Sequence, residues 1–223
     1  IGPNPAESNP ESGAGEAYHF AVSSISFALE QIDGASVVIT SSAPGDGKSV
    51  TALNIAFAAA KDGRKALLID ADERARGLTR LSGLGIGLGL TDLTNGRSVS
   101  DVIGNWHMSD ATSLPFVPAG SRLDDSAAAY FRSTAFRNAL PELTQGNDMV
   151  IIDTPPVMSA AETTDIAAQA DGVILVVNQG TPLRDLHDAR QRLSISRTPI
   201  LGYIFNRAKG STGAYGYGYG YGQ

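Results

Sequence analysis

A short glycine-rich segment with a lysine and a serine carries the clearest chemistry in this sequence. The segment, APGDGKS at residues 43–49, follows a run of β-branched residues and precedes a helical pattern. In such a loop Gly45 and Gly47 let backbone N–H groups approach a phosphate closely, and the helix N-terminus adds a favourable dipole. Lys48 then reaches the β- and γ-phosphates, and the Ser49 hydroxyl binds Mg²⁺.

The surroundings of this loop favour a nucleotide site. The strict pattern has Gly at its first position, where this chain has Ser42. An ordinary glycine-rich turn before a helix is the alternative interpretation. Because the order strand, loop, helix is complete, we predict a site for ATP or ADP with Mg²⁺. Asp46 and Val50 belong to the same nucleotide-binding segment.

Two aspartates end apolar runs elsewhere in the chain. Asp70 follows Ala66–Ile69, and Asp153 follows Met149–Ile152. The carboxyl ends of parallel strands share one edge of a sheet, where ligands collect. We therefore expect both carboxylates beside the phosphate loop, placed to hold Mg²⁺ directly or through its waters.

Further polar residues surround these positions. Asp72 could accept a proton from an attacking hydroxyl, and Arg74 could stabilise phosphoryl charge, although an exposed charged turn is the alternative. Asn206 and Arg207 end the last apolar run, and we expect them at the nucleotide edge, where the amide of Asn206 could contact adenine.

The elements that position these residues alternate between strands and helices. Continuous apolar runs typical of strands buried on both faces are Val37–Thr40, Ala66–Ile69, Met149–Ile152, Gly172–Val177 and Ile200–Phe205, with a weaker one at Leu114–Val117. Helical patterns cover residues 16–31, Ser49–Ala60, Thr134–Leu143 and Leu186–Ile195, and residues 83–98 are the least regular. This order predicts an α/β fold, a doubly wound and mostly parallel sheet flanked by helices as in P-loop NTPases.

Composition divides the 223 residues into one domain with two flexible ends. Residues 1–15 are rich in Pro, Gly, Ser and Glu and are predicted to be a linker. Residues 16–209 form the predicted domain. Residues 210–223 are predicted to be a mobile Gly/Tyr-rich tail, which contains four of the seven tyrosines.

Bulk properties exclude several classes of function. The net charge of −6 gives no reason to expect a nucleic-acid surface. The absence of cysteine excludes disulfides, thiol catalysis and cysteine-ligated metals, and fits a reducing cytosol. No apolar run approaches the roughly 20 residues that cross a bilayer.

The sequence from residue 16 to 223 resembles the bacterial tyrosine kinases that govern polysaccharide chain length. The resemblance rests on APGDGKS (Walker A), LLIDADER (Walker A′), VIIDTPP (Walker B), the segments LTDLTNG and PFVPAG, and the tyrosine-rich C-terminus. It implies a protein-tyrosine autokinase in which Lys48 and Ser49 bind phosphate and Mg²⁺. It also implies that Asp70, Asp72 and Asp153 form the catalytic acidic set.

The same resemblance implies acceptors and partners. The phosphoacceptors would be the tail tyrosines Tyr215, Tyr217, Tyr219 and Tyr221, modified in trans after self-association. A transmembrane activator, fused upstream or separate, would hold the domain at the cytoplasmic face of the membrane, and a cognate tyrosine phosphatase would reverse the reaction. The activity would regulate export of an exopolysaccharide or capsule.

Some family features are absent. The first helix usually carries a Glu-x-x-Arg-x-x-Arg pattern used in ring assembly, where this chain has Glu16, His19 and Val22. Glu162 replaces an Asp expected after the Walker B prolines, at a possible metal-facing position, and an Asn-Pro pair is lost at 121–125.

Two other functions are consistent with the phosphate loop. One is an ATPase switch related to the DNA-partitioning ATPases, although their second loop lysine is replaced here by Ala43. The other is a weakly catalytic nucleotide-binding scaffold of the export machinery.

Overall fold

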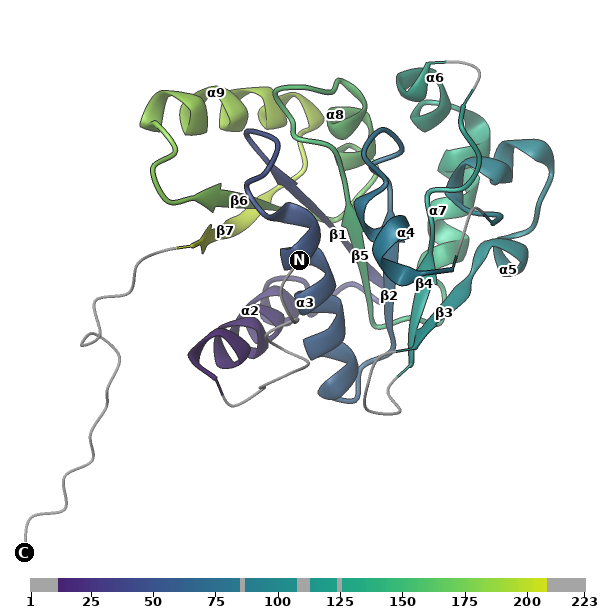
Figure 1. Ribbon diagram of the computed structural model, residues 1–223, viewed down its shortest axis with the longest axis horizontal. Coiled ribbons are helices and arrows are strands. Elements are labelled where there is room, and N and C mark those ends of the chain that lie inside the picture. Colours follow the sequence, from purple (N-terminus) through teal and green to yellow (C-terminus); the bar gives the residue numbers. More distant parts are fainter. Residues whose placement is uncertain (1–11, 85–86, 108–112, 124–125, 208–223) are drawn as a thin grey trace, which may run out of the picture.

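The computed structural model describes residues 12–84, 87–107, 113–123 and 126–207. The tail with its four tyrosines and most of the expected linker lie outside the described residues. Within them, a central sheet is covered by helices on both faces (Figure 1). No helix in these ranges is long and apolar enough to cross a membrane.

Seven strands form this sheet in the order β3-β4-β2-β5-β1-β6-β7. They are β1 (Ala35–Ser41), β2 (Ala66–Asp70), β3 (Gly104–His107), β4 (Ser113–Val117), β5 (Met149–Asp153), β6 (Gly172–Asn178) and β7 (Ile200–Asn206). All neighbouring pairs are parallel except β3 and β4. The predicted doubly wound, mostly parallel fold is therefore confirmed.

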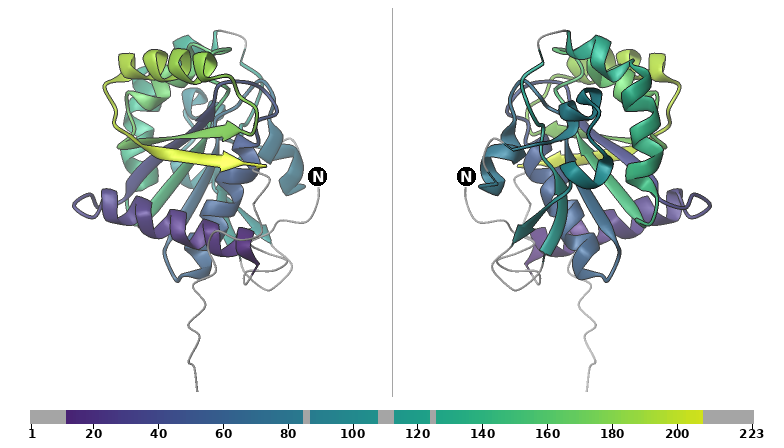
Figure 2. Two further views of the ribbon diagram at one scale, coloured as in Figure 1. Left: turned by 90° about the vertical axis from the view of Figure 1, so that its left-hand side faces the viewer. Right: turned by 90° about the vertical axis from the view of Figure 1, so that its right-hand side faces the viewer.

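Helices pack on both faces of the sheet (Figure 2), and an apolar layer lies between the sheet and the helices on each face. The first layer contains α2 (Gly13–Ala28), α3 (Lys48–Lys61) and α4 (Gly77–Ser82). The second contains the 3₁₀ helix η1 (Leu90–Asn95), α5 (Val99–Val102), α6 (Ala127–Phe131), α7 (Thr134–Thr144), α8 (Glu162–Ala167) and α9 (Leu183–Leu193), which continues into the 3₁₀ helix η2 (Ser194–Ser196). Burial on both faces explains why the central strands are continuously apolar.

The sequence-based elements differ from the structure in several places: the short helices α4, α5, α6 and α8 were not predicted, and the expected helix Leu186–Ile195 is Leu183–Leu193. The first helix begins at Gly13, inside the expected linker, because the Ser12 side chain accepts a hydrogen bond from the Gly15 N–H and caps it. The segment 83–98 contains η1. Strand β3 was not predicted at all: of its four residues only Trp106 is buried, where it packs edge-to-face on Phe116.

The first helix also shows what replaces the missing ring-assembly arginines. Val22 is fully buried in the core, and His19 Nδ1 lies 2.8 Å from Asp62 Oδ1. Val22 is therefore a core residue, and the partner of His19 in this structure is a residue of the same chain.

Candidate active site

The phosphate loop joins the end of β1 to the start of α3. Both of its glycines have positive φ, 87° at Gly45 and 94° at Gly47, a region that side chains rarely adopt. Gly47 is the residue that precedes α3, so backbone N–H groups at this end of the helix face the position expected for phosphate. The first turn of α3 contains Lys48, Ser49 and Val50, as predicted for a nucleotide-binding segment.

Two side chains hold the loop from within. The carboxylate of Asp46, only 6% exposed, accepts hydrogen bonds from the Ala43 N–H at 2.9 Å and the Ser42 hydroxyl at 3.3 Å. Asn206, at the end of β7, donates from Nδ2 to the Asp46 carbonyl at 2.9 Å, and its Oδ1 accepts from the Arg207 N–H. The side chains of Asp46 and Asn206 thus brace the loop, and a contact between Asn206 and adenine stays a prediction.

The contact between Asn206 and the loop leaves different amounts of space around Gly45 and Gly47. A Cβ added at Gly47 would lie 1.9 Å from Asn206 Nδ2, whereas one added at Gly45 would meet nothing within 4 Å. We expect Gly47→Ala to weaken ATP binding at least ~10-fold more than Gly45→Ala, because only the first combines the positive-φ strain with a steric clash. Calorimetric titration of both variants with ATP and Mg²⁺ checks this, and equal losses would contradict it.

Lys48 lies among acidic side chains. Its Nζ is 2.8 Å from Asp72 Oδ2, 3.3 Å from Ser49 Oγ and 3.9 Å from Asp153 Oδ1. Burial lowers the pKa of Lys48, but the negative charges of Asp153 and Asp72 outweigh it and leave the pKa raised. The lysine therefore stays cationic, ready to exchange its carboxylate partners for phosphate oxygens.

Asp153 is the carboxylate best suited to a metal ion. It is fully buried, and within the described ranges neither oxygen makes a hydrogen bond of ordinary geometry. Lys48 Nζ lies 3.9 Å from Oδ1, and the Ser49 hydroxyl is close enough to lower the pKa of Asp153. Burial, opposed by Lys48 but reinforced by Asp70, raises its pKa to about 8. Mg²⁺ is usually held by one or two carboxylates together with waters and substrate phosphates, so an orphaned carboxylate near the Ser49 hydroxyl fits it.

Asp70 has a different environment. Its Oδ2 accepts hydrogen bonds from both the N–H and the hydroxyl of Thr79 at 2.8 Å, and its Oδ1 accepts from the Asp72 N–H at 3.1 Å. Burial raises its pKa, and these hydrogen bonds oppose the rise. Asp70 is thus held in place by Thr79 and Asp72, and its role as a metal ligand, like those of Ser49 and Asp153, stays a prediction.

Thr79 was not singled out from the sequence. Its hydroxyl donates to Asp70 and accepts from the Ala119 N–H at 2.9 Å, which links Asp70 to the PFVPAG segment. We expect Thr79→Val to lower ATP turnover by about 3–10-fold while Thr79→Ser stays near wild type, because the serine keeps the hydroxyl. Steady-state assays check this; equal activity of the two variants would show that the hydroxyl is dispensable.

Glu162 lies in an ion pair. Its buried carboxylate accepts a 2.7 Å hydrogen bond from Arg74 Nε, and a contact with a metal ion stays a prediction. Arg74 follows Asp72 in the turn after β2, and the carboxylate of Asp72 contacts Lys48 of the phosphate loop. Within the described residues no group of three or more acidic or histidine side chains is arranged to hold a metal by itself.

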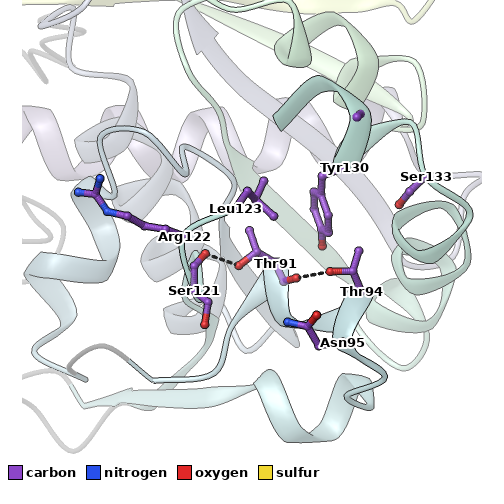
Figure 3. A pocket seen from close by; sticks show the side chains of 9 residues that line it. Thr91, Thr94, Asn95, Ser121, Arg122, Leu123, Tyr130 and Ser133 are labelled. Carbon is purple, nitrogen blue, oxygen red and sulfur yellow. Dashed lines mark hydrogen bonds between the residues drawn. The ribbon is translucent and has the colours of Figure 1, made fainter. Parts of the chain in front are cut away.

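A separate hollow of about 360 Å³ lies between η1 and α6 and is drawn in Figure 3. Its hydroxyls are already used: Thr91 donates to the Ser121 carbonyl at 2.7 Å, Thr94 to the Thr91 carbonyl, and Tyr130 to the Leu90 carbonyl. These bonds connect the LTDLTNG segment to the chain after PFVPAG, so both segments serve to support the site.

The fold and this site define a P-loop nucleotide-binding domain of the phosphoryl-transfer type. Residues 35–182 match the family model described as an AAA domain. The chain is 34% identical over 209 residues to the tyrosine-protein kinase YwqD of Bacillus subtilis, covering 92% of this chain and 85% of that protein. The chain belongs to the bacterial tyrosine kinase family.

Other similar proteins differ in chain length and in how closely their structures superpose on this one. The putative tyrosine-protein kinase EpsB of Ralstonia solanacearum is 30% identical over 96% of this chain, which spans only 28% of that protein. The BceF tyrosine kinase domain superposes with a TM-score of 0.78 at 28% identity, over 91% of this chain and 81% of that one. A cobyrinic acid a,c-diamide synthase from Mycobacterium smegmatis, solved with an ATP analogue and magnesium, shares the fold at TM-score 0.64 and 22% identity, over 77% of this chain and 74% of that one.

Proposed function

We propose that this protein is an ATP-dependent tyrosine autokinase that phosphorylates Tyr215, Tyr217, Tyr219 and Tyr221 of a neighbouring copy. The observation that carries the proposal is the bond between Asn206 and the phosphate loop. It holds Asn206, the last residue of β7, at the rim of the site, and the tail tyrosines follow this residue in the sequence. Tyr215 follows Asn206 by nine residues, which extend to at most about 30 Å, enough to reach its own site or a neighbour's.

The residues divide the chemistry among them. Lys48 turns from Asp72 to the β- and γ-phosphates, and the released Asp72 accepts the proton of the attacking tyrosine hydroxyl. A bond forms from the tyrosine oxygen to the γ-phosphorus as the bond to the β–γ bridging oxygen breaks, and ADP leaves. Mg²⁺ held by Ser49, Asp70 and Asp153, directly or through its waters, would neutralise charge on the phosphates. Arg74 stabilises the transferring phosphoryl group.

The proposal extends to the setting of the enzyme. A transmembrane activator, separate or fused upstream, holds the domain at the inner face of the membrane; the chain spans 85% of YwqD but only 28% of EpsB, so both arrangements are consistent with its relatives. A tyrosine phosphatase reverses the modification, and the cycle regulates polysaccharide export. Each phosphate adds about −1.5 to −2 charges, so tail phosphorylation drives subunits apart.

A mixing experiment tests the trans reaction. The Lys48→Met chain keeps its tail but lacks a working phosphate loop, and a chain ending at residue 209 keeps the loop but lacks the tail. Incubated together with ATP and Mg²⁺, they are expected to yield phosphotyrosine on the Lys48→Met chain, mapped by mass spectrometry, while neither reacts alone. A wild-type chain that labels itself while the mixture stays unlabelled indicates a cis reaction.

The same assay separates the alternatives. ATP turnover without phosphotyrosine, with the activator's cytoplasmic segment added, indicates the ATPase switch. Nucleotide binding without turnover indicates the scaffold. Size-exclusion light scattering on phosphorylated and dephosphorylated protein reports assembly, and equal particle sizes count against control of assembly by the tail.

A further inference from the structure

The ion pair between Arg74 and Glu162 joins two segments that flank the phosphate site. Arg74 lies in the turn after β2, two residues beyond Asp72, and Glu162 is the first residue of α8. The distance from Nε to Oε1 is 2.7 Å, and the two side chains differ sharply in exposure, 59% for the arginine and 1% for the glutamate. The pair therefore runs from the interior to the open side of the domain.

Both ends of the pair are anchored. The turn is closed by the Ala75 N–H, which donates to Asp72 Oδ1 at 2.9 Å. The start of α8 is fixed by the Thr163 hydroxyl, which donates at 2.9 Å to the carbonyl of Pro155 in the Walker B loop. The bridge thus connects two fixed segments and leaves the guanidinium little freedom about its Nε–H.

Most of the hydrogen-bond donors of the Arg74 guanidinium are unused in the described structure. Among the described residues its only hydrogen bond is the one to Glu162, made by Nε–H. An arginine carries five N–H donors in a planar fork, so the four on the terminal nitrogens remain for a ligand. That fork matches the oxygens of a phosphoryl group.

Stability alone does not explain the buried carboxylate of Glu162, because ion pairs that bury a carboxylate are weak evidence of stabilisation. The carboxylate of Glu162 has a functional role if it fixes the direction in which the Arg74 guanidinium points.

We infer that Glu162 is a positioning residue, which holds Arg74 with its free edge toward the phosphoryl group in transit. The inference rests on the proposed function, because it assigns Arg74 to that group. It requires that Arg74 and Glu162 stabilise the transferring phosphoryl group and leave the binding of ADP unchanged.

Binding measurements test this without any need for a tyrosine acceptor. Calorimetry compares ADP with ADP plus fluoroaluminate, a mimic of the transferring phosphoryl group, in Mg²⁺ buffer. For Arg74→Ala, affinity for the fluoroaluminate complex is expected to fall ~100-fold, and for Glu162→Gln ~10-fold, with ADP affinity within about twofold of wild type. The double variant should be no weaker than Arg74→Ala alone, because Glu162 acts only through the arginine.

Asp165→Asn is the matched control. Asp165 lies on the same helix as Glu162, and its Oδ2 lies 3.7 Å from Arg132 Nε in a more exposed ion pair. The substitution should change neither the affinity for ADP nor that for the fluoroaluminate complex. Thermal unfolding of every variant detects general damage. Additive losses in the double variant, an unchanged fluoroaluminate affinity in Glu162→Gln, or a wild-type chain that does not distinguish the two complexes would each overturn the inference.

Kinetics complete the test and separate it from the proposed function. In ATP turnover, Glu162→Gln should lower kcat about tenfold and leave KM for ATP nearly unchanged, whereas a merely structural role would also move KM and the melting temperature. A wild-type chain that forms no phosphotyrosine refutes the autokinase proposal, while the fluoroaluminate affinities still decide the role of Glu162.

Discussion

Asp153→Asn is expected to abolish phosphotyrosine formation, by at least ~10³-fold, and at the same time to raise the melting temperature of the protein in EDTA. The loss of activity follows because the orphaned carboxylate is the group that fits Mg²⁺. The gain in stability follows because burial disfavours the ionised carboxylate more than Lys48 and the Ser49 hydroxyl favour it, as the raised pKa of Asp153 shows.

The gain should depend on pH in a defined direction. The pKa of Asp153 is raised from an ordinary value near 3.8 to about 8 in the folded chain. Because the pKa is raised on folding, the protonated carboxyl of Asp153 contributes its full share of stability below the pKa of the unfolded chain. This contribution is lost as the pH rises through the pKa of the folded chain. The advantage of the asparagine should therefore grow between about pH 4 and pH 8, with each kcal/mol worth about 2–4 °C.

Thermal unfolding at pH 5 and pH 8 measures this effect. Asp188→Asn, at a half-exposed position on α9, serves as the control and should shift the melting temperature little at either pH. A melting temperature of Asp153→Asn below wild type at pH 8 would show that the carboxylate is stabilised in the metal-free fold.

Lys48→Met should abolish phosphoryl transfer to a similar extent but shift stability the other way. Its Nζ lies close to Asp72 and Asp153, and both carboxylates are almost completely buried. Removing one partner of a buried ion pair costs about 3–5 kcal/mol, so the melting temperature should fall by at least about 6 °C.

A double variant isolates the electrostatic cause. Adding Asp153→Asn to Lys48→Met removes one of the two uncompensated carboxylates and should restore much of the lost melting temperature. Differential scanning calorimetry of the four chains gives the coupling between the sites, and strictly additive shifts would show that the two residues do not interact.

Periodicity and apolar runs predicted most of the sheet because its central strands are buried on both faces. Ala66–Ile69 and Met149–Ile152 each became a strand with one more residue, the aspartate that reaches the site. Strand β3 escaped because an edge strand with one face open needs only a single buried side chain, here Trp106. The tertiary contact with Phe116, not local propensity, stabilises it.

The site was predictable where a residue type has a fixed role at a fixed spacing, as for Lys48 and Ser49. The supporting contacts were not predictable, since they join residues far apart in the sequence: Asn206 to Asp46, and Arg74 to Glu162. Sequence alone also could not distinguish Asp70, whose oxygens are occupied, from Asp153, whose oxygens are orphaned. That difference depends on where Thr79 lies in the folded chain.

The burial of α3 has a consequence for how the phosphate loop moves. Ten of the fourteen residues of this helix are buried, among them Ala52, Ile55, Ala56 and Phe57. A helix enclosed in this way cannot open by itself, so its amide hydrogens exchange with solvent only when the whole domain unfolds. The interior of the helix therefore shares the global stability of the protein, whereas Ser49 and Val50 in its partly exposed first turn can move with the phosphate loop.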